Sequence, residues 1–185
     1  MDHGGDDGTG SGEDPLVRAF LDLRERLLGT AWYVLGNRED AKEAVEEGFL
    51  KCWRRRSDAA RHARIEAWIF SVVLNAARDM RRRRTVRRAD SLPVEDAMPA
   101  QVKEPDPAVE AGRRERLDRV RAALLDLPEA EREVFLLRQN GDLPFTEIAG
   151  IVGAPVGTVK SRMRLALLRL RTVLRPAADA AGRVS

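Results

Sequence analysis

The most restrictive feature of this 185-residue sequence is the stretch Leu143 to Leu174, which reads as two helices joined by a tight turn. Before the turn, apolar residues such as Ile148 and Val152 recur at helical spacing. Gly153 can adopt the positive φ of a helix end, and Pro155 suits the first position of the next helix. A short helix, a turn and a longer basic helix are typical of a helix-turn-helix, whose second helix fits the DNA major groove.

The second of these helices separates an apolar face from a polar one. The residues predicted to face inward are Val156, Val159, Met163, Ala166, Leu167 and Leu170. Leu165 is predicted on the exposed side. The residues predicted to contact DNA are Thr158, Lys160, Ser161, Arg162 and Arg164. Hydroxyls and guanidinium groups can bond phosphates or base edges. The alternative is a plain helical hairpin whose basic residues are only solvated.

Composition narrows the chemistry that this chain can perform. The only cysteine is Cys52 and the only histidines are His3 and His62, so we expect no disulfide, no metal site and no cofactor. No nucleotide-binding glycine loop and no catalytic motif is present, and we expect no enzyme activity. Net charge is only +3, but arginines occur in clusters that suit nucleic acid. No apolar run reaches the length of a membrane span, so we expect a cytoplasmic protein without membrane insertion.

Upstream, hydrophobic periodicity predicts three further helices. They cover Pro15 to Leu35, Asp40 to Trp53 and Glu66 to about Arg84. In the second, the periodicity places Cys52 and Trp53 on the buried side. Acids form an exposed face of the same helix, which is solubilising at the least. Its members are Asp40, Glu43, Glu46 and Glu47.

Basic residues gather around the third of these helices. The charged segment Arg54 to Arg64 lacks apolar periodicity and is predicted as a loop. A polar stripe on the helix can follow a DNA backbone or face water; its members are Ser71, Asn75, Arg78 and Arg82. The arginine run that begins at Arg81 could neutralise several phosphates.

Proline and acidic residues dominate 89–111, which is predicted as a flexible linker. Further helices are predicted from Arg113 to Leu125 and from Pro128 to Gln139. The fold class is therefore all-α, with two small helical domains. The predicted division is 1–14, a disordered tail; 15–88, the first domain; 89–111, the linker; 112–176, the second domain; and 177–185, a tail.

The amino-acid sequences of four segments resemble those of the extracytoplasmic-function (ECF) sigma factors, group IV of the sigma-70 family. EIAGIVGAPVGTVKSRMRLALLRLR and its leader LLDLPEAEREVFLLRQNGDLPFTEIA resemble region 4. NREDAKEAVEEGFLKCWRR resembles regions 2.1–2.2, and EAWIFSVVLNAARDMRRRR resembles regions 2.3–2.4. The resemblance implies a promoter-specificity subunit of bacterial RNA polymerase.

What the resemblance implies can be assigned residue by residue. Asp40, Glu43, Glu46 and Glu47 would dock on the β′ clamp helices, while region 4 would meet the β flap. The residues implied at the opened −10 strand are Arg61, Arg64, Asn75, Arg78 and Arg82. Those implied at the −35 duplex are the five polar residues of the last helix. An anti-sigma factor is an implied further partner.

Glu46 stands where the family commonly has glutamine, Pro144 stands where a serine N-cap is common, and three further positions lack an arginine. Ser71, Leu74 and Leu165 stand where arginine is usual, which puts the −10 and −35 preferences in question. Two other functions stay open: a stand-alone helix-turn-helix regulator, and a polymerase-binding adaptor that does not melt promoters. The sequence does not identify the promoter, the inducing signal, the anti-sigma factor or the role of the acidic N-terminal tail.

Overall fold

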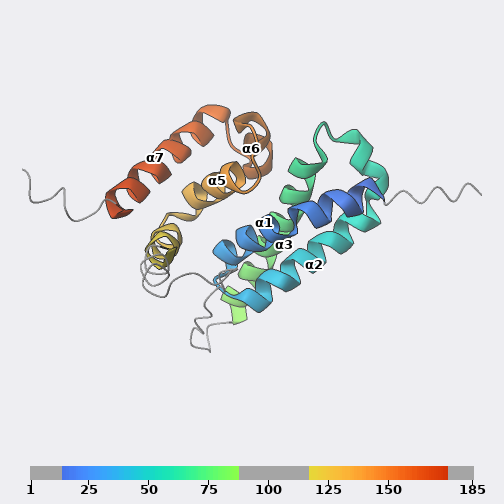
Figure 1. The fold of residues 1–185 in the computed structure, drawn as a ribbon, viewed down its shortest axis with the longest axis horizontal. Coiled ribbons are helices and arrows are strands. Elements are labelled where there is room, and N and C mark those ends of the chain that lie inside the picture. The colour runs from blue at the N-terminus through green and yellow to red at the C-terminus, as the bar shows by residue number, and fades with distance from the viewer. Residues whose placement is uncertain (1–13, 88–116, 175–185) are drawn as a thin grey trace, which may run out of the picture.

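The protein is described by a computed structural model that covers residues 14–87 and 117–174 (Figure 1). The helices of the N-terminal half are α1 (Pro15–Leu35), α2 (Arg38–Arg54), the 3₁₀ helix η1 (Arg56–Arg61) and α3 (Ile65–Arg87). Those of the C-terminal half are a helix over 117–125, α5 (Glu129–Gln139), α6 (Phe145–Val152) and α7 (Val156–Leu174). The prediction of an all-α fold is confirmed. The predicted linker and the two predicted tails lie outside the described residues, except for Asp14 at the end of the first tail.

Local signals explain both ends of α1. The Asp14 carboxylate caps the helix by accepting a 2.8 Å hydrogen bond from the Leu16 amide, and Pro15 occupies the first turn, where no amide donor is needed. At the other end Gly36 has a φ of 70°, and its amide bonds the Trp32 carbonyl. The predicted boundaries of this helix are confirmed.

Helices α1, α2 and α3 pack around one apolar core. Phe20, Leu27, Ala44, Ile69 and Val73 are all buried in it. The N-terminal half therefore has the three-helix architecture that the periodicity predicts.

The C-terminal half packs α6 and α7 around α5. Its core joins Val134 of α5, Ile148 of α6 and Val159 of α7, each of which is fully buried. A second cluster lies beneath the helix over 117–125, where Leu124 packs with Leu170. These contacts hold the two helices of the helix-turn-helix at a fixed angle to each other.

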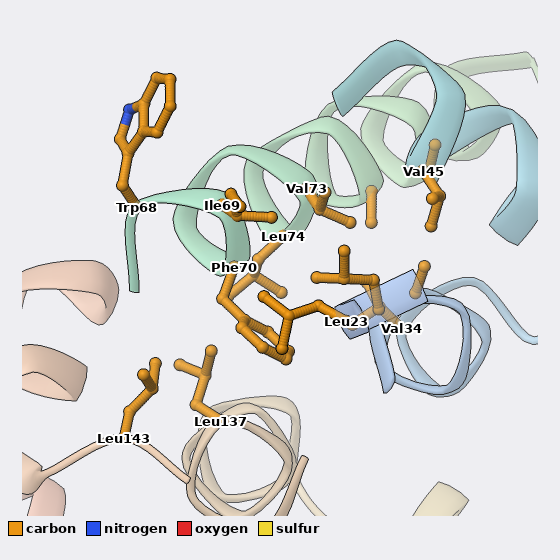
Figure 2. Packing of buried hydrophobic residues seen from close by; sticks show 14 of the residues in the cluster. Leu23, Val34, Val45, Trp68, Ile69, Phe70, Val73, Leu74, Leu137 and Leu143 are labelled. Atoms are coloured by element: carbon orange, nitrogen blue, oxygen red, sulfur yellow. The ribbon is translucent and has the colours of Figure 1, made fainter. Parts of the chain in front are cut away.

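The two halves also pack against each other. Figure 1 shows α5 lying between α7 and α1, and α6 contacts α3 as well. In Figure 2, Phe70 of α3 points toward Leu137 of α5 and Leu143 of the following turn, and all three are almost completely buried. At the edge of this contact, the Asn140 amide donates a 3.0 Å hydrogen bond to Thr30 of α1. The apolar core of the chain is thus continuous across both halves.

The prediction that Arg54 to Arg64 form a loop is wrong in part. Arg54 still belongs to α2, and η1 follows almost at once, closed by 3₁₀-type bonds such as that from the Asp58 amide to the Arg55 carbonyl at 2.8 Å. Trp53 is also not buried as predicted, since its side chain is 38% exposed. It lies about 100° around α2 from Cys52, outside the buried stripe.

No helix in the two described ranges combines the length and the apolar character needed to cross a bilayer.

Candidate nucleic-acid and polymerase interfaces

The turn between α6 and α7 depends on Gly153. This residue has a φ of 64° and ends α6 with a hydrogen bond from its amide to the Ala149 carbonyl. An ideal Cβ there would meet no atom within 4 Å, so the backbone conformation, and not the space, selects glycine. The turn places the first residues of α7 on the outside of the C-terminal half.

The exposed face of α7 carries the polar residues that the sequence predicts at the −35 duplex. Thr158, Lys160, Ser161 and Arg164 are exposed, and Arg162 is half-buried beside them. Among the residues that the structure describes, no ion pair involves Lys160, Arg162 or Arg164. Their donors are therefore available to an external partner.

Two leucines of α7 lie differently from their predictions. Leu165 is half-buried where an exposed side chain is predicted, and Leu167 is 47% exposed where an inward one is predicted. The buried stripe through Val159, Met163 and Ala166 is narrow, and Leu167 lies about 80° around the helix from Val159. The α7 helix packs on α5, on α6 and on the helix over 117–125, and these contacts leave its flanks open.

A cationic groove lies where the end of α2 meets the middle of α3. Its volume is about 350 Å³, and it is lined by Lys51, Arg54, Arg55, Val72 and Asn75. Asn75 is exposed, so its amide can offer both a donor and an acceptor to a base edge. The sequence predicts Asn75 at the −10 strand, but it does not single out the three cations on the opposite wall. Their signal is the basic run that begins at Lys51, which by itself only indicates phosphate contact.

Arg78, another residue predicted at the −10 strand, is already engaged. Its Nε donates to Glu133 Oε1 of α5 at 2.9 Å, a second guanidinium nitrogen bonds the other carboxylate oxygen, and Nη1 reaches Asn75 Oδ1 at 3.1 Å. The hydrogen bonds that Arg78 donates to Glu133 raise the pKa of Arg78, against the opposing effect of burial. This guanidinium is permanently charged and is shared between α3 and α5.

The remaining residues predicted at the −10 strand are more dispersed. Arg64 lies 3.8 Å from Glu66 and 4.0 Å from Glu147 of α6, whereas the exposed Arg82 pairs with Asp79 at 2.6 Å. For Arg61 only the backbone is described, within η1. Arg82 lies on the same face of α3 as Asn75, two turns further along the helix, whereas Arg64 lies before α3 begins and contacts α6.

Leu74 is not on the DNA side of α3. The sequence comparison with the family places it where an arginine is usual, yet its side chain is 1% exposed and belongs to the continuous core. Helix α3 packs against α1 and α2 and also meets α6, so this side of α3 is an interior surface.

The acidic face of α2 is divided into two parts. Glu43 and Glu46 are exposed. Asp40 instead pairs with Arg84, and Glu47 pairs with Lys51 at 2.8 Å and with Arg83 at 3.3 Å. The hydrogen bond from Lys51 is the largest cause that lowers the pKa of Glu47. Only Glu43 and Glu46 present their charge without such a partner among the described residues.

These observations define an all-α protein in which a three-helix N-terminal half is packed against a C-terminal half that carries a helix-turn-helix. Comparison with known families gives matches in both halves: residues 19–87 match "Sigma-70 region 2", and residues 117–170 match "Sigma-70, region 4". The chain belongs to the ECF sigma factors of the sigma-70 family.

Individual relatives agree with this assignment. Over 134 residues the chain is 35% identical to the ECF RNA polymerase sigma factor RpoE of Cereibacter sphaeroides, an alignment that covers 71% of this chain and 70% of that protein. It is 30% identical over 175 residues to the ECF RNA polymerase sigma factor SigE of Mycolicibacterium smegmatis, covering 94% of this chain and 66% of the relative. Among solved structures, the sigma factor RpoE in complex with the anti-sigma factor NepR from Bartonella quintana is 25% identical, with a TM-score of 0.70 over 88% of this chain and 98% of that one.

Proposed function

We propose that this chain directs bacterial RNA polymerase to promoters by reading a −35 duplex with α7 and holding the opened −10 strand in the groove between α2 and α3. The observation that supports this most strongly is the presence of two separate cationic surfaces, one on each of the two sigma regions. On α7 it is the exposed start of the helix, and on the N-terminal half it is the groove around Asn75. Two elements of one promoter need two such surfaces.

At the −35 element, the proposed contacts divide into two kinds. Arg162 and Arg164 can each donate two hydrogen bonds to a guanine or to a phosphate. Lys160 can contact a phosphate as a point charge. Thr158 and Ser161 carry short hydroxyls that suit the close approach of a helix to the groove. Leu165 is half-buried at the edge of this face, so it suits contact with a thymine methyl better than a phosphate contact.

At the −10 element, the groove offers a nucleobase the Asn75 amide on one wall and cations on the other. Lys51, Arg54 and Arg55 can neutralise the phosphates on either side of a captured base. An unstacked base is recognised by its exposed edge, and single-stranded DNA binds through such combinations of charge and contact. The free energy for strand opening then comes from the captured bases and the whole holoenzyme.

Docking on the polymerase is proposed through the exposed acids Glu43 and Glu46 of α2, with Asp40 and Glu47 beside them. A basic surface on the β′ clamp helices would complement them, and the β flap would meet the C-terminal half. The solved relative with its anti-sigma factor supports a partner of that kind for this chain as well. Chemistry is then carried out by the polymerase, in the cytoplasm, and this chain needs no cofactor or metal.

Run-off transcription tests the function directly. Bacterial core polymerase is supplied with sheared genomic DNA from the source organism, with and without the full chain, and transcripts are mapped. Discrete start sites that appear only with the chain, with shared sequences near −10 and −35, are expected. Binding to an active core polymerase without any such transcripts would favour the adaptor function, and DNA binding on symmetric sites without polymerase would favour the stand-alone regulator.

A further inference from the structure

A pocket separate from the groove around Asn75 lies where the start of α3 meets α6. Its volume is about 350 Å³, which falls within the range of small-molecule sites, about 300–1,000 Å³. Both halves of the chain contribute to its walls. The lining includes Arg64, Ala67, Trp68 and Ser71 from the N-terminal half, and Glu147 and Ile151 from α6.

One carboxylate oxygen in this pocket lacks a donor. Glu147 Oε2 is buried, and it has no hydrogen-bond partner among the residues that the structure describes. Arg64 Nε lies 4.0 Å from it, which is beyond hydrogen-bond distance. A buried acceptor that is left unsatisfied costs free energy, so a donor supplied from outside the chain would be bound favourably here.

The charges around this oxygen favour a cation. Arg64 also lies 3.8 Å from Glu66, so one guanidinium is shared between two carboxylates. These three side chains together carry one excess negative charge. A bound monocation would neutralise that charge and donate to Glu147, while Arg64 remains beside Glu66.

Aromatic and aliphatic side chains form much of the remaining wall. Trp68 leaves α3 in a different direction from Phe70, which points toward the C-terminal half (Figure 2). The His62 ring stacks on the indole of Trp68, with 5.2 Å between the ring centroids and 13° between the ring planes. Ala67 and Ile151 add aliphatic surface. A planar apolar group suits walls of this kind.

The short side chain of Ser71 helps to keep the pocket open. Ser71 is half-buried and lines the pocket with a hydroxyl group. An arginine, which is usual at this position in the family, would extend into the same space and bring a guanidinium toward Glu147. This chain therefore has room for an external cation where a longer side chain would supply an internal one.

We propose that this pocket binds a small organic monocation, in which a planar apolar group carries an amidinium, guanidinium or ammonium head. The head donates to Glu147 Oε2, and the planar group lies against Trp68 and Ile151. Because the ligand contacts both α3 and α6, it stabilises the folded chain in proportion to its occupancy. This inference goes beyond the proposed promoter function, since it requires neither DNA nor polymerase.

Benzamidine tests the site in the full chain, and benzamide, which has the same shape without the charge, is the matched probe. Isothermal titration calorimetry measures both affinities. We expect a dissociation constant of about 1 mM or tighter for benzamidine. Benzamide should bind at least about tenfold more weakly, because the charge-assisted hydrogen bond is lost. Heteronuclear NMR of the three tryptophan indoles locates the probe: the Trp68 signal, assigned with Trp68→Phe, should shift.

Two variants change the pocket and one leaves it intact. Glu147→Gln removes the charge of the acceptor, and Ser71→Arg fills the pocket with an internal cation. Each should weaken benzamidine binding at least about tenfold. Glu25→Gln removes an exposed carboxylate of α1 outside the pocket and should bind the probe as the wild-type chain does. Thermal midpoints without the probe show whether each variant folds, and benzamidine should raise the wild-type midpoint.

Several results would overturn the proposal. They are equal affinity for the two probes, unchanged benzamidine affinity in folded Glu147→Gln, and an NMR shift at Trp32 or Trp53 without one at Trp68. Absence of benzamidine binding at millimolar concentrations would also overturn it. If neither pocket variant folds, the comparison of the two probes on the wild-type chain, together with the Trp68 signal, still decides the outcome.

Discussion

Gly48 of α2 faces Val73 of α3 so closely that an ideal Cβ on the glycine would lie 2.6 Å from the valine Cγ2 and 3.2 Å from its Cα. The second distance involves backbone, which a side-chain rotation cannot relieve. The two helices of the N-terminal half that bound the cationic groove therefore approach each other at a position where only a hydrogen fits.

Gly48→Ala should consequently destabilise the chain, by about 1–3 kcal/mol, because the added methyl overpacks the α2–α3 contact. Urea denaturation followed by circular dichroism measures the change. The matched control is Gly150→Ala in α6, where a Cβ meets nothing within 4 Å and the substitution should be neutral or stabilising. Equal stabilities for the two variants would contradict the close approach.

Gly153→Ala should strain the turn of the helix-turn-helix, because its φ of 64° disfavours any residue with a Cβ by about 1–2 kcal/mol. We expect a lower thermal midpoint and weaker binding to the −35 duplex, since α7 would start in a changed orientation. Gly157→Ala, inside α7 and with open space around its Cβ, is the control for stability. The thermal midpoint of this control should not fall.

Arg164→Ala should reduce run-off transcription without lowering the stability of the chain, because the side chain is exposed and α7 stays folded. If its contact is with a phosphate, the slope of log affinity against log salt falls by about one. If its contact is with a base, discrimination at one position of the −35 element is lost instead. The control is Arg171→Ala, an exposed residue in the last turn of the same helix. An equal loss of transcription in that variant would contradict a specific contact by Arg164.

The exposed acids of α2 should matter for polymerase binding. We expect the double variant Glu43→Gln and Glu46→Gln to bind core polymerase more weakly, mainly through slower association, because complementary surface charges act on the encounter. Glu39→Gln, an exposed acid of the same helix paired only with Lys42, is the control. Surface plasmon resonance with immobilised core enzyme gives both rate constants. A loss in the control as large as in the double variant would argue against a defined docking face.

Cys52 should be unreactive in the folded chain. Burial raises the pKa of its thiol to about 12, so almost no thiolate exists at pH 8 and alkylation by iodoacetamide should require unfolding. The unfolded thiol ionises near its ordinary pKa of about 8.5, so the unfolded state binds fewer protons above that pH. The contribution of this thiol to stability is thus complete below about pH 8.5 and falls as the pH rises toward 12. The Cys52→Ala variant should lack this part of the loss of stability at alkaline pH.

The parts of the fold that sequence predicts well are those with local causes. The bounds of α1 follow from a cap at Asp14 and a glycine at Gly36, and the outer face of α7 follows from helical periodicity alone. Trp53 and Leu167 were assigned to the wrong side because each lies at the margin of a narrow buried stripe. At such margins the width of the stripe is set by the neighbouring helices, which a single helical pattern does not reveal.

The contact between the two halves is absent from the sequence prediction for a physical reason. Arg78 and Glu133 are 55 positions apart, and acids in the first turns of α5 are equally well explained by favourable interaction with the helix dipole. Leu74 stands where the family usually has an arginine, and its burial follows from the packing of α3 on other helices, which the pattern of α3 alone does not reveal. Only the three-dimensional structure shows that Glu133 is paired with the candidate DNA-binding residue Arg78 and is not a solvated acid.

The apolar seam of Phe70, Leu137 and Leu143 has a consequence for how many copies of this protein a cell must make. A partner that binds only separated halves meets a small fraction of the molecules, so its apparent dissociation constant rises in inverse proportion to that fraction. For such a partner, each increment of about 1.4 kcal/mol in the seam raises the concentration needed for half-occupancy about tenfold. Single-residue changes in this seam would therefore tune the expression level at which such a partner becomes occupied, without altering the side chains that face DNA on α7.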